Sequence, residues 1–368
     1  MVQNEKINSS KEKPLCLISP LDWGLGHTTR CIPLIRELLK YGASVIVACN
    51  STQKKLLSPE FPEIAFVHLD GYGLKYGRNK FFTAFLITLQ APKILIKIKK
   101  ENIWIHQFLL KTPVNAVISD NRYGFFARKT PSVFITHQLF ILTGAGNIIN
   151  RMVHWFTYRF ISRFSECWVP DFKNGSTVAG KLSHPSLLPA VPTHYIGCLS
   201  RFIHLPAPLL YERLIILSGP EPQRTILEEN ILEQLQNLPG RSALVRGLPG
   251  NDNPAPQIEG VLIINHAGAE QLNLLIESSS LIISRSGYTS IMDLLKLKKK
   301  MILIPTPGQQ EQEYLGKYLH SKKWALSFDQ KNFSIAAAEQ QARHFDFQFF
   351  EEDMELYKER VKKFVMSI

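Results

Sequence analysis

A strand–loop–helix–strand unit near the start of the chain constrains the fold more than any other feature. Residues 14–19 are a short apolar run typical of a buried strand, and a loop that contains glycine follows it. Apolar side chains at helical spacing then run from residue 28 to residue 41, Gly42 ends this helix, and residues 43–48 are a second apolar run. Two buried strands joined by such a helix lie parallel in one sheet. The sequence therefore predicts an α/β fold around a parallel sheet.

The same alternation recurs along the chain and restarts after the proline-rich stretch 204–208. Before that stretch, strands are also predicted at 114–119 and 132–136, with the end of a short helix at 127–130 between them. After it, the same patterns predict strands at 213–218, 261–265, 281–284 and 301–305, and a helix at 225–238. Two consecutive halves of this kind predict two doubly wound domains that face a cleft.

Four segments are expected along the chain. Residues 1–13 are polar and are predicted to be a disordered head, and residues 14–205 and 206–345 are the two predicted domains. The last segment, 346–368, contains a basic amphipathic stretch at 349–364 with no strand after it. We expect this segment to be a helix that packs back across the first domain.

Charge is divided unevenly between the two halves. The chain has 368 residues and a net charge of +12, but residues 1–205 hold 25 basic against 11 acidic residues, whereas residues 206–368 hold 18 against 20. The first half is therefore expected to face something anionic. The chain contains neither a secretory signal pattern nor the ~18 consecutive apolar residues of a membrane span. Its five cysteines include no C-x-x-C pair, which fits a reducing compartment, so we predict a cytoplasmic location.

The loop Asp22–Arg30 follows the first strand and is the first candidate site. Its glycines, Gly24 and Gly26, lack the third glycine of a dinucleotide fingerprint, so a Rossmann dehydrogenase is disfavoured. They still allow an acceptor oxygen to approach the start of a helix, with Thr28 beside it. His27 lies at the carboxyl edge of the sheet and is the candidate general base. For an isolated histidine, packing within the loop is the better interpretation, but this setting favours catalysis.

Asp120 lies at the carboxyl end of the apolar strand predicted at 114–119. A carboxylate there can orient His27 and stabilise its charged form, as the third member of a triad does. Capping of the following segment is an equally good and compatible interpretation. His137 and Gln138 follow another strand at the same edge and are predicted, more weakly, to contact the acceptor.

The second half contains a strand–small-residue loop–helix unit at 284–293 and a Gln/Glu-rich turn at 305–313. The first arrangement can hold an anion with backbone N–H groups, and Asp293 could then reach the hydroxyls of a nucleotide sugar. The turn supplies carboxamides and carboxylates that suit a sugar, although a solvated helix start is the simpler alternative.

These motifs resemble the two-domain GT-B nucleotide-sugar glycosyltransferases, particularly the lipid-intermediate N-acetylglucosaminyltransferase group of peptidoglycan synthesis, with its family 28 C-terminal domain. The resemblance implies that the loop backbone holds a diphosphate, that Asp293 holds the ribose, and that Gln312 with Glu313 holds the donor sugar. Glu313 departs from the second Gln of that pattern, and Ser218-Gly219 stands where a second phosphate loop is expected, without its usual double glycine. The donor-binding residues implied by the resemblance are Ser218, Gly219, Arg285, Ser286, Gly287, Tyr288, Thr289, Asp293, Gln312 and Glu313.

The loop Gly24–Cys31 is also similar to that of the nucleotide-sugar hydrolase of pseudaminic acid synthesis, in which a histidine activates water. In many GT-B transferases a histidine here deprotonates the acceptor and an aspartate supports it, which His27 and Asp120 match. No Asp-x-Asp motif occurs in the chain, so the predicted mechanism needs no metal and no cofactor beyond the UDP-sugar substrate.

The leading hypothesis is therefore a hexosyl- or N-acetylhexosaminyltransferase that uses a UDP-sugar. A hydrolase or 2-epimerase of the same fold, and a non-catalytic subunit that recruits a partner to membranes, are the alternatives. Residues 78–111 and 151–164 mix apolar, aromatic and basic side chains, which predicts an anionic membrane surface as a partner rather than nucleic acid. The first stretch includes Phe81, Phe82, Phe85, Leu86 and Leu89 at helical spacing. A lipid-linked acceptor at the inner face of the cell membrane, and hence a role in the cell envelope, would follow.

Overall fold

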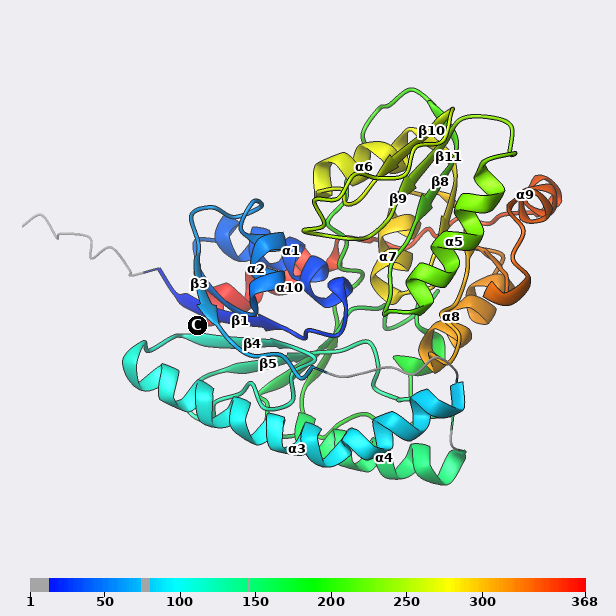
Figure 1. Ribbon diagram of the computed structural model, residues 1–368. Helices are drawn as coiled ribbons and strands as arrows, with labels where there is room; N and C mark the ends of the chain where they lie inside the picture. Colours follow the sequence, from blue (N-terminus) through cyan, green and yellow to red (C-terminus); the bar gives the residue numbers. More distant parts are fainter. Residues whose placement is uncertain (1–12, 74–79, 145) are drawn as a thin grey trace, which may run out of the picture.

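A computed structural model describes residues 13–73, 80–144 and 146–368, so most of the predicted head at 1–13 lies outside the described residues. The first sheet has seven parallel strands in the order β3-β2-β1-β4-β5-β6-β7. These strands are β1 (Leu15–Pro20), β2 (Ser44–Cys49), β3 (Ala65–His68), β4 (Ala116–Asp120), β5 (Ser132–Ile135), β6 (Glu166–Val169) and β7 (Thr193–Tyr195). Figure 1 shows this sheet in the lower half of the molecule.

The second sheet has six parallel strands in the order β10-β9-β8-β11-β12-β13. They are β8 (Tyr211–Ile216), β9 (Ser242–Val245), β10 (Val261–Ile264), β11 (Ser279–Ser284), β12 (Lys300–Leu303) and β13 (Leu326–Ser327). Both sheets are doubly wound, as the sequence predicts, because their inner strands are apolar on both faces and need helices on both sides.

Ten α-helices connect the described strands and cover the two sheets (Figure 1). They are α1 (Leu25–Lys40), α2 (Ser51–Leu57), α3 (Lys80–Lys111), α4 (Asn147–Ile161), α5 (Gln223–Leu235), α6 (Ala269–Glu277), α7 (Tyr288–Lys296), α8 (Gln310–Ser321), α9 (Ile335–His344) and α10 (Leu356–Ser367). Across the described residues, no helix is both long and apolar enough to cross a membrane.

The strand order reverses at one point in each sheet, and this places the candidate site. In the first sheet β1 pairs with both β2 and β4, with Pro20 opposite Asp120 at the carboxyl ends. In the second sheet β8 pairs with both β9 and β11, with Ile216 opposite Ser284. The connections leave in opposite directions at such a switch point, and open α/β sheets bind their ligands outside the carboxyl ends of the strands there.

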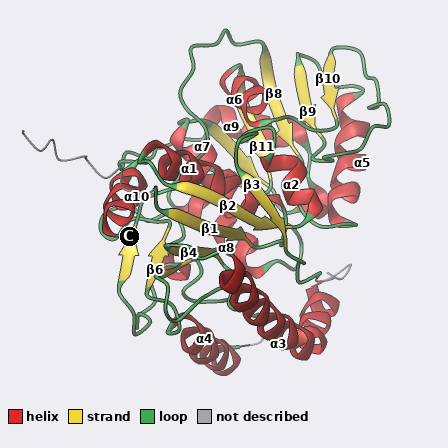
Figure 2. Ribbon diagram, turned by 90° about the vertical axis from the view of Figure 1, so that its left-hand side faces the viewer, coloured by secondary structure: helices red, strands yellow, loops and turns green. Residues whose placement is uncertain are grey.

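The last helix returns from the second half to the first. In α10, Phe364 packs edge-on against Trp168 of β6 with ring centroids 5.2 Å apart, and Arg360 pairs with Glu166. Figure 2 shows α10 beside the first sheet. These contacts anchor the C-terminal segment on the first half of the chain.

Three predicted helix positions are wrong in detail. Helix α1 begins at Leu25 instead of residue 28, because Gly24 adopts a positive φ of 79° and starts the helix inside the glycine loop. Residues 127–130 form a turn, because the Ser132 hydroxyl accepts from the Ala127 N–H and donates to the Ala127 carbonyl, which takes these groups out of a helix. Helix α10 begins only at Leu356, because the acidic stretch before it is a loop.

Candidate active site

The first turn of α1 carries His27 to the carboxyl edge of the first sheet. Gly24 provides the N-cap, and no side chain there hydrogen-bonds the free N–H groups of the first turn. Gly26 lets α1 approach α7 closely: a Cβ at this position would lie 3.0 Å from Thr289 Oγ1, and the Thr289 hydroxyl donates to the Gly26 carbonyl at 3.1 Å. The first turns of the two helices, one from each half, thus meet directly.

His27 and Asp120 form the pair that the sequence predicts. The His27 Nδ1 atom lies 3.1 Å from Asp120 Oδ1. Asp120 is fully buried, whereas the His27 side chain keeps 14% of its surface exposed. Because a carboxylate only accepts hydrogen bonds, Nδ1 of a neutral His27 carries the proton, and Nε2 keeps the lone pair that a base needs.

Arg30, which the sequence analysis did not select, neutralises the same carboxylate. Its Nε atom donates to Asp120 Oδ2 at 2.6 Å, and its Nη2 group donates to Oδ1. Burial alone would raise the pKa of Asp120, but the charges and hydrogen bonds of Arg30 and His27 outweigh it and lower that pKa. Burial and the Arg30 charge lower the pKa of His27, against the opposing effect of Asp120. His27 is therefore neutral at physiological pH.

His137 and Gln138 lie where the two halves touch. His137 Nδ1 is 3.1 Å from Arg30 Nη1, and His137 Nε2 is 2.7 Å from Glu311 Oε1 at the start of α8. Gln138 donates to the other oxygen of Glu311. The ring of Tyr288 stacks on His137, with centroids 4.0 Å apart. The sequence did not single out Glu311. It lies three residues after Gly308 in a Gln/Glu-rich turn, and nothing in the pattern distinguishes it from the neighbouring Gln and Glu residues.

Three backbone segments at the carboxyl edge of the second sheet lie together. Gly219, in the loop after β8, has a φ of +106°. A Cβ at this position would lie 3.5 Å from Oγ1 of Thr306, so the loop after β8 lies close to the turn after β12. Gly287 caps α7 with no side-chain hydrogen bond to its first turn, and a Cβ on it would meet nothing within 4 Å. Thr306 Oγ1 and Arg285 Nε are buried polar atoms without a hydrogen-bond partner. The unpaired donors of Thr306 and Arg285, together with the open space at Gly287, suit the binding of an anionic group.

The side chains of Gln312 and Glu313 fold back on the turn before α8. Gln312 Oε1 accepts from the Thr306 N–H at 2.9 Å, and Glu313 Oε1 accepts from the Gly308 N–H at 3.0 Å. The Ser286 hydroxyl donates to the Gln312 carbonyl at 2.8 Å. This arrangement fixes the turn against the start of α7, so both predicted sugar contacts lie beside the predicted phosphate loop.

Asp293 lies further along α7, buried against residues 200 and 201. The Ser200 hydroxyl donates to Asp293 Oδ1 at 2.6 Å. Burial raises the pKa of Asp293 to about 6, although the Arg201 charge acts in the opposite direction. Arg201 Nε is itself buried without a partner. A carboxylate and a guanidinium with spare hydrogen-bonding capacity thus lie together behind the loop.

Comparison with known proteins finds one matching domain family and several similar folds. Residues 259–362 match the glycosyltransferase family 28 C-terminal domain. No curated protein sequence matches the chain significantly. Solved structures match over nearly the whole chain: spinosyn forosaminyltransferase SpnP is 15% identical, with 96% of this chain and 95% of that chain covered and a TM-score of 0.57. MurG of Acinetobacter baumannii is 14% identical, with 96% and 95% covered and a TM-score of 0.51.

Spinosyn rhamnosyltransferase SpnG, solved with thymidine diphosphate, is 11% identical, with 96% of each chain covered and a TM-score of 0.61. The chain has the GT-B fold, and its residues 259–362 match the glycosyltransferase family 28 C-terminal domain. The predicted fold and the predicted family resemblance are thereby confirmed.

Three side chains that were predicted to contact ligand have other partners in this protein. Thr28, in the first turn of α1, is buried, and its hydroxyl accepts from Gln53 Nε2 at 3.1 Å. Arg285 is buried within the second half and donates to backbone carbonyls, among them that of Gln223 at 2.8 Å. The Tyr288 hydroxyl donates to the carbonyl of Pro170 in the first half. These side chains support the walls of the site, and the backbone N–H groups of their loops remain the predicted ligand donors.

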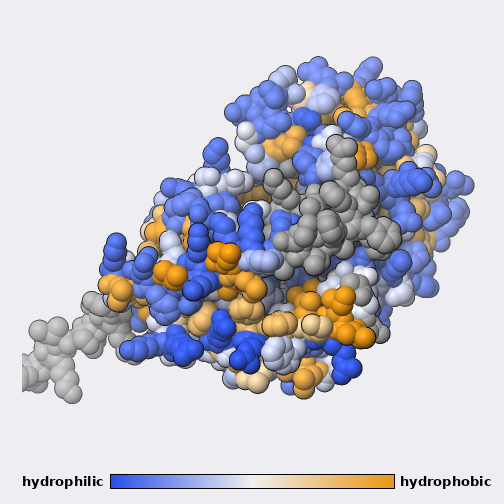
Figure 3. Space-filling view, turned by 60° about the horizontal axis from the view of Figure 1, so that its bottom comes forward, coloured by the Kyte–Doolittle hydropathy of each residue, from blue (hydrophilic) through white to orange (hydrophobic). Residues whose placement is uncertain are grey.

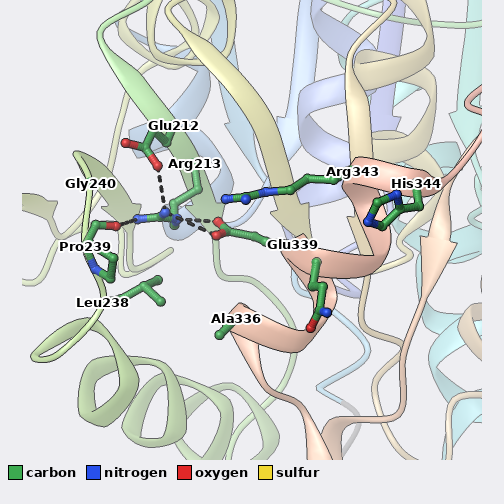
Figure 4. Close-up of a pocket in the computed structure, with 10 residues that line it drawn as sticks. Glu212, Arg213, Leu238, Pro239, Gly240, Ala336, Glu339, Arg343 and His344 are labelled. Atoms are coloured by element: carbon green, nitrogen blue, oxygen red, sulfur yellow. Dashed lines mark hydrogen bonds and ion pairs between the residues drawn. The ribbon is translucent and has the colours of Figure 1, made fainter.

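A separate pocket of about 510 Å³ lies at the amino end of the second sheet, beside β8 and α9 (Figure 4). Its buried guanidinium, Arg213, pairs with Glu339 and donates to the Pro239 carbonyl at 2.9 Å. Glu212 also pairs with Arg213 there, so this guanidinium is shared between two carboxylates. This pocket lies at the opposite end of the second sheet from the loop before α7, so it is separate from the group of residues around His27 and Asp120.

Proposed function

We propose that this glycosyltransferase moves a hexosyl or N-acetylhexosaminyl group from a UDP-sugar to an acceptor hydroxyl, with His27 as the general base. The observation that carries the proposal is the position of His27. Its Nδ1 is held by Asp120, its ring is partly exposed, and its helix touches α7, whose first turn has free N–H groups. A base and an anion-binding loop thus meet across one crevice.

The proposed reaction is a direct displacement. The acceptor O–H gives its proton to His27 Nε2 while its oxygen bonds to the anomeric carbon, and the bond from that carbon to the diphosphate breaks. The lowered pKa of His27 keeps the lone pair of Nε2 available at neutral pH. Asp120 then stabilises the imidazolium, as the orienting carboxylate of a triad does.

The departing diphosphate is proposed to lie against Gly219, Ser286 and Gly287. The unpaired N–H groups at the start of α7 and the helix dipole favour negative charge there, so no metal ion is needed to stabilise the leaving group. In this proposal Asp293 exchanges its bond from Ser200 for one from a ribose hydroxyl. Gln312 and Glu313 then face the donor sugar.

The acceptor is proposed to be linked to a lipid and delivered from an anionic membrane surface. Helices α3 and α4 lie side by side below the first sheet, where Ile94 and Phe160 pack on one cluster (Figures 1 and 2). Their outer faces expose large apolar side chains: Leu95, Ile96, Ile103, Leu110, Ile148, Ile149, Met152, Trp155 and Phe156. Figure 3 shows hydrophobic and hydrophilic residues interleaved on this side of the molecule.

Basic residues interleave with that apolar face. Lys99, Lys100, Arg151 and Arg159 are exposed, and the Arg159 guanidinium lies 5.6 Å from the ring centre of Trp155. Cations beside apolar and aromatic side chains suit the interface of an anionic membrane. The side chains of residues 80–89, which include the predicted Phe81, Phe82, Phe85, Leu86 and Leu89, lie outside the described residues. We propose a cytoplasmic enzyme that is peripheral to the inner face of the cell membrane and acts on the cell envelope.

The decisive experiment is a screen of nucleotide sugars in two steps. A true donor raises the melting temperature in a concentration-dependent way, because a ligand stabilises the fold by RT ln(1 + [L]/Kd). Each donor that binds is then incubated with and without lipid-linked and soluble saccharide acceptors, and the products are analysed. Sugar transfer supports the proposal, whereas release of free sugar in the presence of every acceptor would indicate a hydrolase instead.

A further inference from the structure

A continuous row of buried polar contacts connects the Asp120 carboxylate in the first half with Glu311 in the second. Arg30 binds Asp120 through Nε and Nη2, which leaves Nη1 to reach His137 Nδ1 at 3.1 Å. His137 Nε2 then reaches Glu311 Oε1 at 2.7 Å. Arg30, Asp120 and His137 are all buried, so each of these polar groups depends on the next for its hydrogen bond.

The chemistry of the groups fixes the direction of every hydrogen bond in this row. A guanidinium only donates, so His137 Nδ1 accepts from Arg30 and its proton lies on Nε2. The Nε2–H group then donates to the Glu311 carboxylate. At the other end, Asp120 accepts from His27 Nδ1–H. Two histidines in one row are thus held in opposite tautomers by fixed partners.

Glu311 is the only member of this row from the second half. It also accepts a hydrogen bond from Gln138. The ring of Tyr288 stacks on one face of His137. Docking of the starts of α7 and α8 on the first half therefore brings Glu311 to His137. Separation of the two halves would remove the acceptor of His137 Nε2–H.

We infer that Glu311 is a positioning residue that acts through His137 and Arg30 to fix the Asp120 carboxylate and hence the base tautomer of His27. This inference rests on the proposed function, because it assigns the row to the setting of the general base. The half of the chain that binds the donor would thereby prepare the base when it closes on the first half.

The tautomers can be measured without any substrate. The full-length protein labelled with ¹⁵N-histidine gives two-bond nitrogen–proton correlation spectra that distinguish Nδ1–H from Nε2–H rings. His27→Gln and His137→Gln assign the two signals. At pH 8, above the ordinary histidine pKa of ~6.5, we expect His27 as Nδ1–H and His137 as Nε2–H. An Nδ1–H signal for His137 in the unmodified protein would overturn the inference.

Glu311→Ala tests the coupling. We expect the pure Nδ1–H signal of His27 to be lost and replaced by one shifted toward a mixture of tautomers. Glu311→Gln retains an acceptor oxygen, so it should keep the unmodified pattern. The matched control is Tyr318→Phe, which removes another contact from α8 to the first half, the hydrogen bond from the Tyr318 hydroxyl to the Thr177 carbonyl at 2.9 Å.

The control separates positioning from mere docking. An unchanged His27 signal in a folded Glu311→Ala protein would overturn the inference, and so would an equal change in Tyr318→Phe. Should Glu311→Ala not fold, a loss of the His27 signal pattern in Glu311→Gln would also contradict the inference, because that variant keeps the acceptor. These outcomes are independent of the donor screen, so failure of sugar transfer and failure of the coupling can be distinguished.

Discussion

The loops that begin α1 and α7 are built alike but differ in the groups that they present. Each follows an inner strand at a switch point, and each helix has a glycine N-cap, Gly24 or Gly287, with no side-chain capping bond. The first loop adds His27 and Arg30, which both bind the carboxylate of Asp120. The second adds small residues around an open glycine. In the proposed mechanism, the same local structure serves proton transfer in one half and anion binding in the other.

The largest expected effect comes from removing the base. His27→Ala should reduce turnover by roughly 10²–10⁴-fold, the contribution of a positioned general base, while UDP affinity stays nearly unchanged. Asp120→Asn should reduce turnover somewhat less. Steady-state kinetics with the donor from the screen, together with calorimetric titration of UDP, measures both quantities.

The pH dependence sharpens the same prediction. Because burial and Arg30 lower the pKa of His27, the acidic limb of the rate profile should lie below the ordinary histidine value of ~6.5. Activity should therefore stay level as pH rises through neutrality and fall only on acidification below that value. Wild-type turnover in His27→Ala would show that the first loop is structural and remove the proposed division between the loops.

The second loop should respond in the opposite way. Asp293→Ala removes a charge-assisted hydrogen bond to the proposed ribose, which should weaken UDP binding by about 1.5–3 kcal/mol. The effect on KM for the donor should exceed any effect on turnover. Unchanged UDP affinity in a folded variant would move the nucleotide to another part of the crevice.

The sequence was sufficient to predict the two sheets and the pairing of His27 with Asp120. Apolar runs of strand length identified seven inner strands, β1, β2, β4, β5, β8, β11 and β12, because these strands are buried on both faces and carry a continuous signal. The inner strands β6 and β9, of four residues each, were missed. Asp120 ends such a run, and parallel strands bring their carboxyl ends to one edge, so its approach to His27 followed from topology alone. Short edge strands such as β7 and β13 were missed, since three and two residues carry no usable periodicity.

The contacts between the two halves could not be predicted. Arg30 resembles any basic residue of an amphipathic helix until the fold places it beside Asp120. Glu311 lies in a run of Gln and Glu whose members are equivalent in sequence, and only the docking of α8 selects it for His137. Hydrophobic patterning fixes which residues are inside a sheet layer, but it does not determine how two finished layers meet.

Burial of Asp293 implies a cost in stability that accompanies its proposed role. Its pKa is raised to about 6 in the folded protein against an ordinary value near 3.8. The folded state therefore binds more protons between these values, and the free energy of unfolding falls as pH rises through that range. Asp293→Asn removes the buried charge and should stabilise the protein at pH 7.5 by on the order of 1–3 kcal/mol, with the gain disappearing toward pH 4.

Thermal unfolding at several pH values measures this difference. Asp346→Asn is the control, because Asp346 is an exposed carboxylate that pairs with Lys323 and should give little change. Equal stability of Asp293→Asn and the unmodified protein at pH 7.5 would show that Arg201 and Ser200 fully compensate the buried charge.

The smallest effects per residue are expected at the proposed membrane face, which the second half lacks. Lys100→Gln and Arg151→Gln each remove one exposed cation from α3 or α4, and each should weaken binding to anionic vesicles by about 1 kcal/mol, roughly fivefold. Raising the salt concentration should weaken binding further, because the attraction is screened.

Lys317→Gln, which removes an exposed cation from α8 in the second half, is the matched control and should leave binding unchanged. Co-sedimentation with anionic and neutral vesicles at two salt concentrations measures these differences. If the unmodified protein fails to bind anionic vesicles even at low salt, the apolar and basic face of α3 and α4 is not a membrane surface, and the acceptor is a soluble saccharide.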